Sequence, residues 1–249
     1  MDTAILEISW QGLLIAFVPT AVVIGIMVAW RSIVGTALYA SARMLVQLLL
    51  IGYVLIYIFE TDSWLVIAGV LVIMLTVSSW IATRTLRERT RADYLKALAA
   101  ITLGGVSTLA LVTQFVIGVE PWFSPRYVVP LAGMIFAGSM NAVSLAADRY
   151  EAEMARDSSY MEARRTALQT ALIPIINSMA AAGVVSLPGM MTGQILAGSP
   201  PYEAAKYQLL IMYLITAGTG FGSLAAVWLG SRHLFDDRHR LRLERLKKR

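Results

Sequence analysis

Residues 64–82 read WLVIAGVLVIMLTVSSWIA, nineteen consecutive positions without a charged side chain. A helix of roughly 20 apolar residues is long enough to cross the hydrocarbon core of a bilayer, which is about 30 Å thick. A strand of a membrane barrel would alternate apolar and polar residues with a period of two, and this stretch does not. The stretch therefore predicts a membrane-spanning helix.

Comparable charge-poor runs recur along the rest of the chain, and we expect each of them to be a spanning helix as well. The predicted fold class is therefore all-α integral membrane, with seven transmembrane helices in a single domain over residues 1–249. The seven runs lie at about residues 8–29, 44–59, 64–82, 97–117, 127–146, 170–198 and 207–230.

Two of the runs are unusual in length. The run at 44–59 is short, and the amphipathic segment 32–42 before it is expected to lead into it along the membrane interface. The run at 170–198 is long for one crossing and carries helix-breaking residues, so a kinked or broken sixth helix is expected there. These residues are Pro174, Gly183, Pro188 and Gly189.

The composition agrees with a membrane protein and excludes several other classes. Of the 249 residues 57% are apolar and 15% are charged, whereas soluble domains are about half apolar and a quarter charged. The chain has no Cys, so disulfides and thiolate metal sites are excluded. Its two histidines, His233 and His239, lie in the C-terminal tail, which removes imidazole chemistry from the spans.

The interiors of the seven runs contain no Asp, Glu, Lys, Arg or His. Ion-coupled transporters and intramembrane proteases depend on such groups. The chain also lacks the G-x-x-x-x-G-K-[ST] loop that holds the phosphates of a nucleotide. We therefore expect no enzymatic activity and no cofactor bound by this chain, and uphill transport would need ATP-Mg on a separate partner subunit.

The distribution of basic residues predicts how the chain is oriented. Of the 21 Lys and Arg, 19 fall in four segments that each follow an odd-numbered run. By the positive-inside rule these segments face the cytoplasm, which places the N-terminus outside and the C-terminus inside the cell's inner (plasma) membrane. The remaining two, Arg126 and Lys206, belong to the opposite side. The net charge of +5 reflects this asymmetry and does not indicate nucleic-acid binding.

The segment 148–168 is the longest predicted cytoplasmic connection between two spans. Its apolar residues recur at helical spacings of four and seven, which predicts one helix with a narrow apolar face. Such a helix is suited to docking into a groove on a partner, here a cytoplasmic ATPase. The same residue pattern is also typical of a solvated connector that packs on its own bundle. The partner-coupling candidates are Tyr150, Met154, Met161 and Leu168.

The basic tail 232–249 has leucines interspersed among its charges. It is interpreted either as a segment that rests on anionic lipid headgroups or as a topogenic end.

Polar and small residues of the fifth and sixth runs are candidates for a transport pathway. Asn141 is the most polar side chain of its run and is expected to face the bundle interior or a wet passage. A break at Pro188 would leave backbone carbonyl groups free to face a substrate. The paired methionines Met190 and Met191 offer thioether groups that could bind a soft metal. Both features also occur in ordinary helix packing. The pathway candidates are Asn141, Ser144, Asn177, Ser186, Pro188, Gly189, Met190, Met191 and Gly193, and no metal site is assigned among them.

Four stretches together resemble a known family. They are RMLVQLLLIGY at 43–53, PLAGMI at 130–135, MNAVSLAADR at 140–149 and SLPGMMTG at 186–193. In this order they resemble the permease subunit of the Fet-type iron-export ABC transporters, a family that includes plant aluminium-resistance membrane proteins. The resemblance implies a membrane subunit that pairs with a separate ATP-binding subunit and is linked to iron efflux. Asn177 and Met179 stand where bacterial relatives often carry an acid and a base.

We therefore expect the transmembrane permease subunit of an ABC exporter, with iron as the expected cargo. It would work as a homodimer or a higher homo-oligomer, with two cytoplasmic ATPase subunits. Closure of the ATPases would pull on the segment 148–168 and switch the fifth and sixth spans between two states. The alternative is a passive seven-helix facilitator of a small solute, although the first three and last three runs show no internal repeat.

Overall fold

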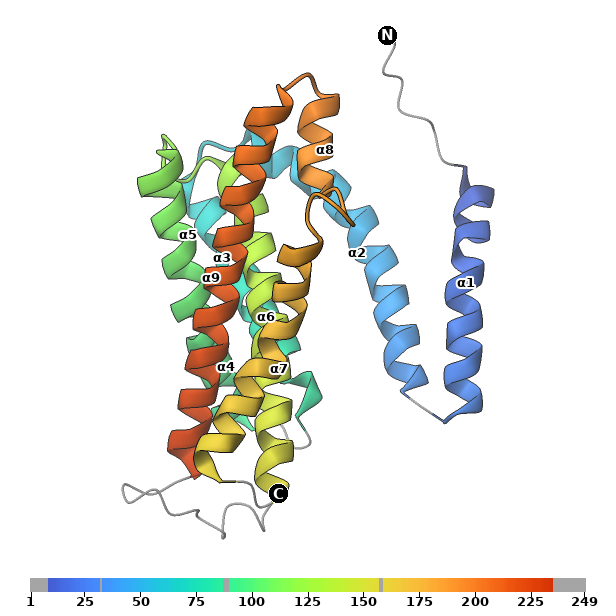
Figure 1. The fold of residues 1–249 in the computed structure, drawn as a ribbon. Coiled ribbons are helices and arrows are strands. Elements are labelled where there is room, and N and C mark those ends of the chain that lie inside the picture. The colour runs from blue at the N-terminus through green and yellow to red at the C-terminus, as the bar shows by residue number, and fades with distance from the viewer. Residues whose placement is uncertain (1–8, 32, 87–89, 157–158, 235–249) are drawn as a thin grey trace. The chain divides into compact units, whose positions relative to one another are not determined.

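The computed structural model describes residues 9–31, 33–86, 90–156 and 159–234, with residues 232–234 described as backbone only. Across these ranges no β-strand occurs, and six helices are long and apolar enough to cross a bilayer (Figure 1). The prediction of an all-helical, multi-pass membrane protein is confirmed.

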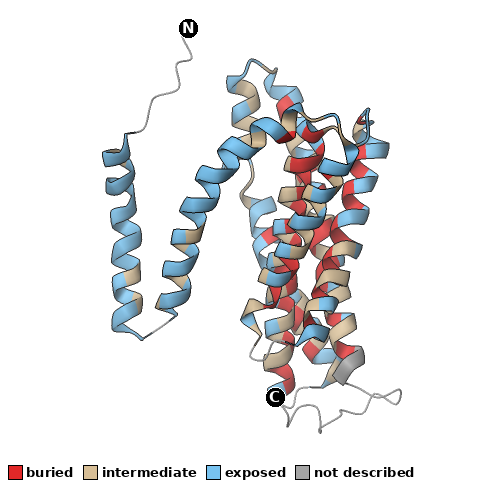
Figure 2. Ribbon diagram, turned by 180° about the vertical axis from the view of Figure 1, so that it is seen from behind, coloured by how far each residue is buried: buried red, intermediate tan, exposed pale blue. Residues whose placement is uncertain are grey.

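Residues 1–60 form a first compact unit, whose described part consists of two helices. They are α1 (Trp10–Ala29) and α2 (Val34–Glu60). The Ser9 side chain caps α1 by accepting a hydrogen bond from the amide of Gly12 at 3.1 Å. No residue of α1 is buried (Figure 2), and a helix that is apolar on all sides is suited to a lipid environment.

The helix α2 differs from its predicted form. The segment 32–42 was expected to lie along the interface ahead of a short span at 44–59, but one helix runs without interruption from Val34 to Glu60. That expectation is wrong because no proline separates the two parts, and the alanine and leucine residues at their junction favour a continuous helix.

Residues 61–249 form the second unit, in which the remaining helices pack together. The run at 97–117 belongs to a longer helical stretch with two π-helical turns. In order the elements are α3 (Trp64–Ala82), η1 (Thr83–Thr85), α4 (Arg91–Ile101), η2 (Thr102–Val106), α5 (Ser107–Leu111), η3 (Val112–Ile117), α6 (Pro125–Ala155), α7 (Tyr160–Ala181), α8 (Gly189–Leu196) and α9 (Pro201–Leu234).

Local sequence explains where several of these helices begin. Thr90 and Asp93 form a capping box, in which each side chain bonds to the backbone of the other. Ser159 caps α7 by accepting from the amide of Glu162 at 3.3 Å. Pro125 occupies the first turn of α6, where its missing N–H costs nothing.

The helix α6 is the centre of the second unit and packs against α3, α7 and α9. Alanines make much of this contact, which lets the helix axes approach closely. A buried cluster joins α6, α7 and α9 and consists of Ala142, Ala146, Tyr150, Met154, Ala163, Ala167, Ala171 and Val227.

The sixth predicted span is broken, as its sequence indicates. The helix α7 runs through Pro174 and ends at Ala181, and α8 begins at Gly189 with Pro188 as its N-cap. Between them Gly183 adopts a positive φ of 85°, a conformation that favours glycine. Neither α7 nor α8 is among the six helices that are long and apolar enough to span a bilayer, since α8 has eight residues and the first turns of α7 are charged.

Most of the described basic residues of the second unit lie at one end of its bundle. The ends of α3, α6 and α9 and the beginnings of α4 and α7 lie there (Figure 1), and the hydroxyl of Tyr160 donates to Ser231 Oγ at 3.4 Å. The described basic side chains at this end are Arg84, Arg91, Lys96, Arg149, Arg156, Arg164 and Arg165, whereas Arg126 and Lys206 belong to the opposite end.

Candidate functional site

A cavity with a mostly apolar wall and three polar side chains lies where α6, α7 and α9 meet. Its volume is about 160 Å³, and its wall includes Asn141 from α6, Ser178 from α7 and Thr219 from α9. All three helices are apolar over most of their length, so these polar groups stand out from their surroundings. A cavity of this size with several polar groups is large enough to hold water or a small polar solute, since a water molecule occupies about 30 Å³.

The hydroxyl of Thr219 is the most informative group of this cavity. The residue is 3% exposed, and its Oγ1 has no hydrogen-bond partner among the described residues. Such a buried polar atom costs free energy unless water or a ligand satisfies it. By contrast, the hydroxyl of Ser178 already donates to the carbonyl oxygen of Pro174 at 2.8 Å. The free hydroxyl of Thr219 therefore points to a wet or ligand-binding cavity.

Glycine and serine residues of α6 keep α9 close to this cavity. A Cβ atom at Gly138 would lie 3.0 Å from Thr219 Oγ1 and 3.0 Å from Ile215 Cγ2. One residue further, Ser139 is fully buried, and its Oγ also has no hydrogen-bond partner among the described residues. The contact between α6 and α9 is thus tight and contains two hydroxyl groups that lack partners within the described chain.

The structure brings only part of the predicted pathway set together. Asn141 lies in the wall of the cavity, but its side chain is exposed and is not enclosed in the bundle interior. Ser144 instead shares a hydrogen bond of 3.0 Å with Thr85 at the end of η1. Asn177 is exposed on α7. The remaining candidates, Ser186, Pro188, Gly189, Met190, Met191 and Gly193, lie in the α7–α8 connection and in α8, outside the residues that line the cavity.

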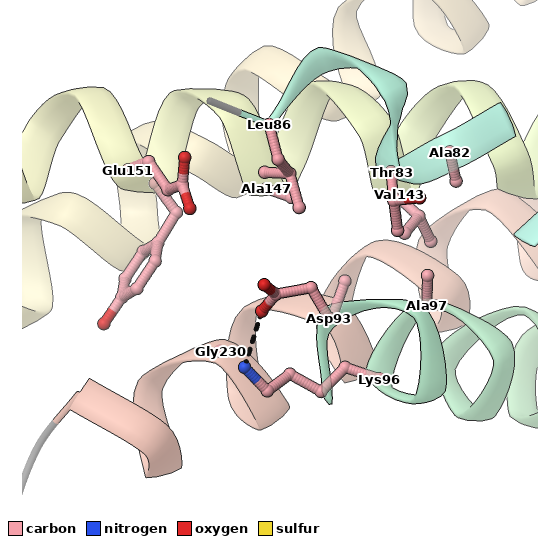
Figure 3. Close-up of a pocket in the computed structure, with 12 residues that line it drawn as sticks. Ala82, Thr83, Leu86, Asp93, Lys96, Ala97, Val143, Ala147, Glu151 and Gly230 are labelled. Carbon is pink, nitrogen blue, oxygen red and sulfur yellow. Dashed lines mark hydrogen bonds and ion pairs between the residues drawn. The ribbon is translucent and has the colours of Figure 1, made fainter. Parts of the chain in front are cut away.

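A second, smaller cavity of about 60 Å³ lies at the basic end of the bundle. Asp93 and Lys96 of α4 form an ion pair at 2.9 Å in its wall, and the side chain of Glu151 points toward the same space (Figure 3). Tyr150 also lines this cavity, and its buried hydroxyl has no hydrogen-bond partner among the described residues. These groups lie where the beginning of α4 contacts the end of α6.

The predicted single helix over 148–168 is wrong. The helix α6 ends at Ala155 and α7 starts at Tyr160, so the four coupling candidates belong to two helices. Tyr150 and Met154 are buried against α7, with 3% and 4% exposure, because the two helices fold back on each other through alanines. Met161 is 69% exposed, and Leu168 is half-buried. The predicted role of the basic tail falls on residues 232–249, whose side chains lie outside the described part of the chain.

Within the described residues, no group of three or more Asp, Glu or His side chains is arranged to hold a metal ion. The polar groups that do face the α6–α7–α9 cavity are hydroxyl and amide groups.

Comparison with known proteins identifies the family. Residues 10–235 match the model of a protein family described as "Uncharacterised protein family (UPF0014)". The chain belongs to this family. The UPF0014 membrane protein slr1647 of Synechocystis sp. is 31% identical over an alignment of 262 positions that covers 97% of this chain and 99% of the relative.

Two other relatives carry informative names. The probable iron export permease protein FetB of Escherichia coli is 29% identical over 85% of this chain and 86% of its own length. The protein ALUMINUM SENSITIVE 3 of Arabidopsis thaliana is 28% identical over 80% and 77%. The predicted resemblance to iron-export permeases and plant aluminium-resistance proteins is confirmed. No solved structure is significantly similar to the chain.

Sequence reasoning missed Thr219 as a residue of the candidate site. It lies in the stretch AGTGFGS at 217–223, whose small residues signal close helix packing. Thr219 is the larger of the two polar side chains in that stretch, and this was the available signal. Its helical partner on α6 could be identified only from the packing of α6 against α9.

Proposed function

We propose that this chain is the transmembrane permease subunit of an ABC exporter that expels a metal ion, iron in the first instance. It would work as at least a dimer with two copies of a separate ATP-binding subunit, which carry the ATP-Mg. The observation that carries the proposal is the similarity to an iron export permease over 85% of the chain. The lack of a phosphate-binding loop in the sequence supports a separate motor subunit.

The α6–α7–α9 cavity is proposed as part of the transport pathway. It combines the exposed amide of Asn141 with the buried hydroxyl of Thr219, which has no partner among the described residues. Polar groups at membrane depth are expected where helices line a passage or bind a substrate. Pro174 lies in the wall of the same cavity and weakens α7 locally, which suits a helix that changes shape during transport.

We propose seven crossings with the N-terminus outside and the C-terminus cytoplasmic. Tyr160 at the start of α7 contacts Ser231 near the end of α9, whereas α8 connects within five residues to the start of α9. The helix α9 has 34 residues and is therefore about 50 Å long. The segment from α7 to α8 thus traverses the bundle in spite of its break, which supports a seventh crossing. The basic end of the bundle would face the cytoplasm of the inner (plasma) membrane.

The connection between α6 and α7 is the proposed docking surface for the ATP-binding subunit. It lies at the basic end of the bundle, and its exposed side chains include Arg156 and Met161. Tyr150 and Met154 would contribute indirectly, because they join the connection to the buried α6–α7 contact. A push or pull on this connection would act on α6 and α7, two of the three helices that line the cavity.

Transport by the reconstituted complex tests the proposal. The chain is placed in liposomes with and without its ATP-binding subunit, and the movement of Fe²⁺ is followed with and without ATP. We expect movement only with both chains and ATP. Asn141→Ala should lower the ATP-dependent rate about fivefold, equivalent to about 1 kcal/mol. The matched variant Gln169→Ala, on the exposed surface of α7, should behave as the wild type. Flux of a solute through the chain alone, without ATP, would instead support a passive facilitator.

A further inference from the structure

A groove larger than either cavity described above lies between the beginning of α7 and the last third of α9. Its volume is about 750 Å³, which falls within the range of about 300–1,000 Å³ for small-molecule sites. The groove has a charged part and an apolar part. Arg164 and Arg165 belong to the first, and Leu168, Leu224 and Val227 belong to the second. It is separate from the α6–α7–α9 cavity, with which it shares no lining residue.

The guanidinium group of Arg164 is held in position at this groove. Its Nη1 donates to the hydroxyl of Tyr160 at 3.1 Å, and its Cζ lies 5.2 Å from the centre of the same ring. The Tyr160 hydroxyl in turn donates to Ser231 Oγ on α9 at 3.4 Å. Only one of the five guanidinium N–H groups is used in the Tyr160 bond, so the others remain for an anion.

Arg165 adds a second positive charge beside Arg164. Its side chain is exposed and has no hydrogen bond or ion pair with any described residue. Glu162 is the acidic residue that lines the groove, so two guanidinium groups face one carboxylate there. The balance is positive, and two neighbouring guanidinium groups bind a phosphate well because they present forked donors.

The apolar part of the groove continues from the arginines along the membrane-spanning direction. Leu168 lies one turn after Arg164 on α7, and Leu224 and Val227 lie on one face of α9. Leu224 is 48% exposed, so its side chain is open to whatever fills the groove. A positive end followed by an apolar wall between two membrane helices matches the headgroup and acyl chain of a phospholipid.

We propose that this groove binds one anionic phospholipid. The phosphate lies on Arg164 and Arg165, and an acyl chain lies along Leu168, Leu224 and Val227. The charge complementarity favours an anionic lipid over a zwitterionic one. The arginines lie at the start of α7, beside the end of the spanning helix α9, and the proposed topology places this end at the membrane surface, which favours a lipid over a soluble ligand. The inference rests on that proposed topology and does not depend on the proposed cargo.

Native mass spectrometry of the purified full chain tests this site. The delipidated protein is mixed with equal amounts of phosphatidylglycerol and phosphatidylcholine, and the bound lipids are counted. We expect the wild type to prefer phosphatidylglycerol about thirtyfold, since each of the two arginines near the surface contributes about 1 kcal/mol. The double variant Arg164→Gln/Arg165→Gln should bind the two lipids almost equally. The matched double variant Arg126→Gln/Lys206→Gln removes two charges from the opposite end and should keep the preference.

Two further measurements distinguish a lipid in this groove from a soluble anion or a protein partner. Arg165→Gln alone removes an exposed side chain without bonds to the described residues, so it tests the site even if the double variant does not fold. It should lower the preference about fivefold. Inorganic phosphate at millimolar concentration should not displace the lipid, because it cannot use the apolar wall. An unchanged lipid preference in both arginine variants, or displacement by inorganic phosphate, would overturn the proposal. The proposal would also be overturned if an arginine variant kept its lipid but lost the ATP-binding subunit or a second copy of the chain. The groove would then be a protein interface.

Discussion

Gly104 and Gly222 pack backbone against backbone. A Cβ atom built on Gly104 would lie 2.5 Å from the amide nitrogen of Gly222 and 2.6 Å from the carbonyl oxygen of Gly218. Contacts this short do not occur between real Cβ atoms and backbone. The π-helical turn Thr102–Val106 and α9 therefore approach each other as closely as two helices can, which is how helices without a hydrophobic driving force gain van der Waals contact in a membrane.

Gly104→Ala should destabilise the protein through this contact. The added methyl group meets backbone on both sides, so the two helices must separate and lose contacts along their length. Overpacking of this kind costs about 1–3 kcal/mol, and the expected fall in melting temperature is roughly 5 °C. Thermal unfolding in detergent, followed by tryptophan fluorescence, measures the change.

Gly220→Ala is the matched control for that experiment. Gly220 lies in the same part of α9, but a Cβ atom built there meets nothing within 4 Å. Replacing a helical glycine with alanine where space is available stabilises a helix by up to about 1 kcal/mol. Equal melting temperatures for Gly104→Ala and Gly220→Ala would contradict the close approach of the two helices.

Thr219→Val should impair transport without changing stability. Valine keeps the shape of threonine but removes the hydroxyl that faces the α6–α7–α9 cavity. If that hydroxyl is in contact with water or cargo, the rate of ATP-dependent transport should fall about fivefold. The free energy of unfolding should stay within about 0.5 kcal/mol of the wild type, because water satisfies the hydroxyl in the folded state.

A dry cavity gives the opposite result for the same variant. Removing a buried hydroxyl without a partner would then stabilise the protein by about 1–3 kcal/mol, and transport would be unaffected. Thr216→Val serves as the control on the same helix, because the hydroxyl of Thr216 already donates to the carbonyl oxygen of Met212 at 2.7 Å. Transport assays and denaturation of both variants distinguish the two cases.

The membrane-spanning helices were predicted from the sequence more accurately than the connections between them. Residues 64–82 form a helix with the predicted bounds, because the thickness of the bilayer sets the length of an uncharged run. The helix over 148–168 was wrong for a different reason. The spacing from Tyr150 to Met154 and the spacing from Met161 to Leu168 are each helical, but a helical period does not reveal that a turn separates them.

The candidate site was predicted only in part, because some of its residues are brought together by contacts between distant helices. The polarity of Asn141 predicted that it faces the bundle interior or a wet passage; it lines the cavity, but its side chain is exposed. Thr219 depends on the packing of α6 on α9, which is a long-range contact without a local sequence signal. The break near Pro188 followed from the residues themselves, since proline and glycine restrict the backbone wherever they occur.

Negative charges at Met154 and Met161, on either side of the α6–α7 connection, should have different effects on folding and on association. Met154 is 4% exposed in the α6–α7 core, so Met154→Asp buries a carboxylate without a partner and should prevent stable folding. Met161 is exposed at the start of α7, so Met161→Asp should keep the fold and weaken co-purification of the ATP-binding subunit about tenfold, or about 1.4 kcal/mol. Size-exclusion profiles report the fold, and pull-down of the ATP-binding subunit reports the association. Undiminished association of a folded Met161→Asp variant would refute the docking role of this connection.

Single cysteines should report the number of crossings, because the chain has no Cys of its own to label. Asp62→Cys lies before α3, Arg156→Cys lies at the end of α6, and Ser199→Cys lies between α8 and α9. With seven crossings and the N-terminus outside, a membrane-impermeant maleimide added to whole cells should label the cysteines at 62 and 199. The cysteine at 156 should react only after the membrane is opened. If α7 and α8 together do not cross, position 199 lies on the same side as position 156, and both should be protected in whole cells.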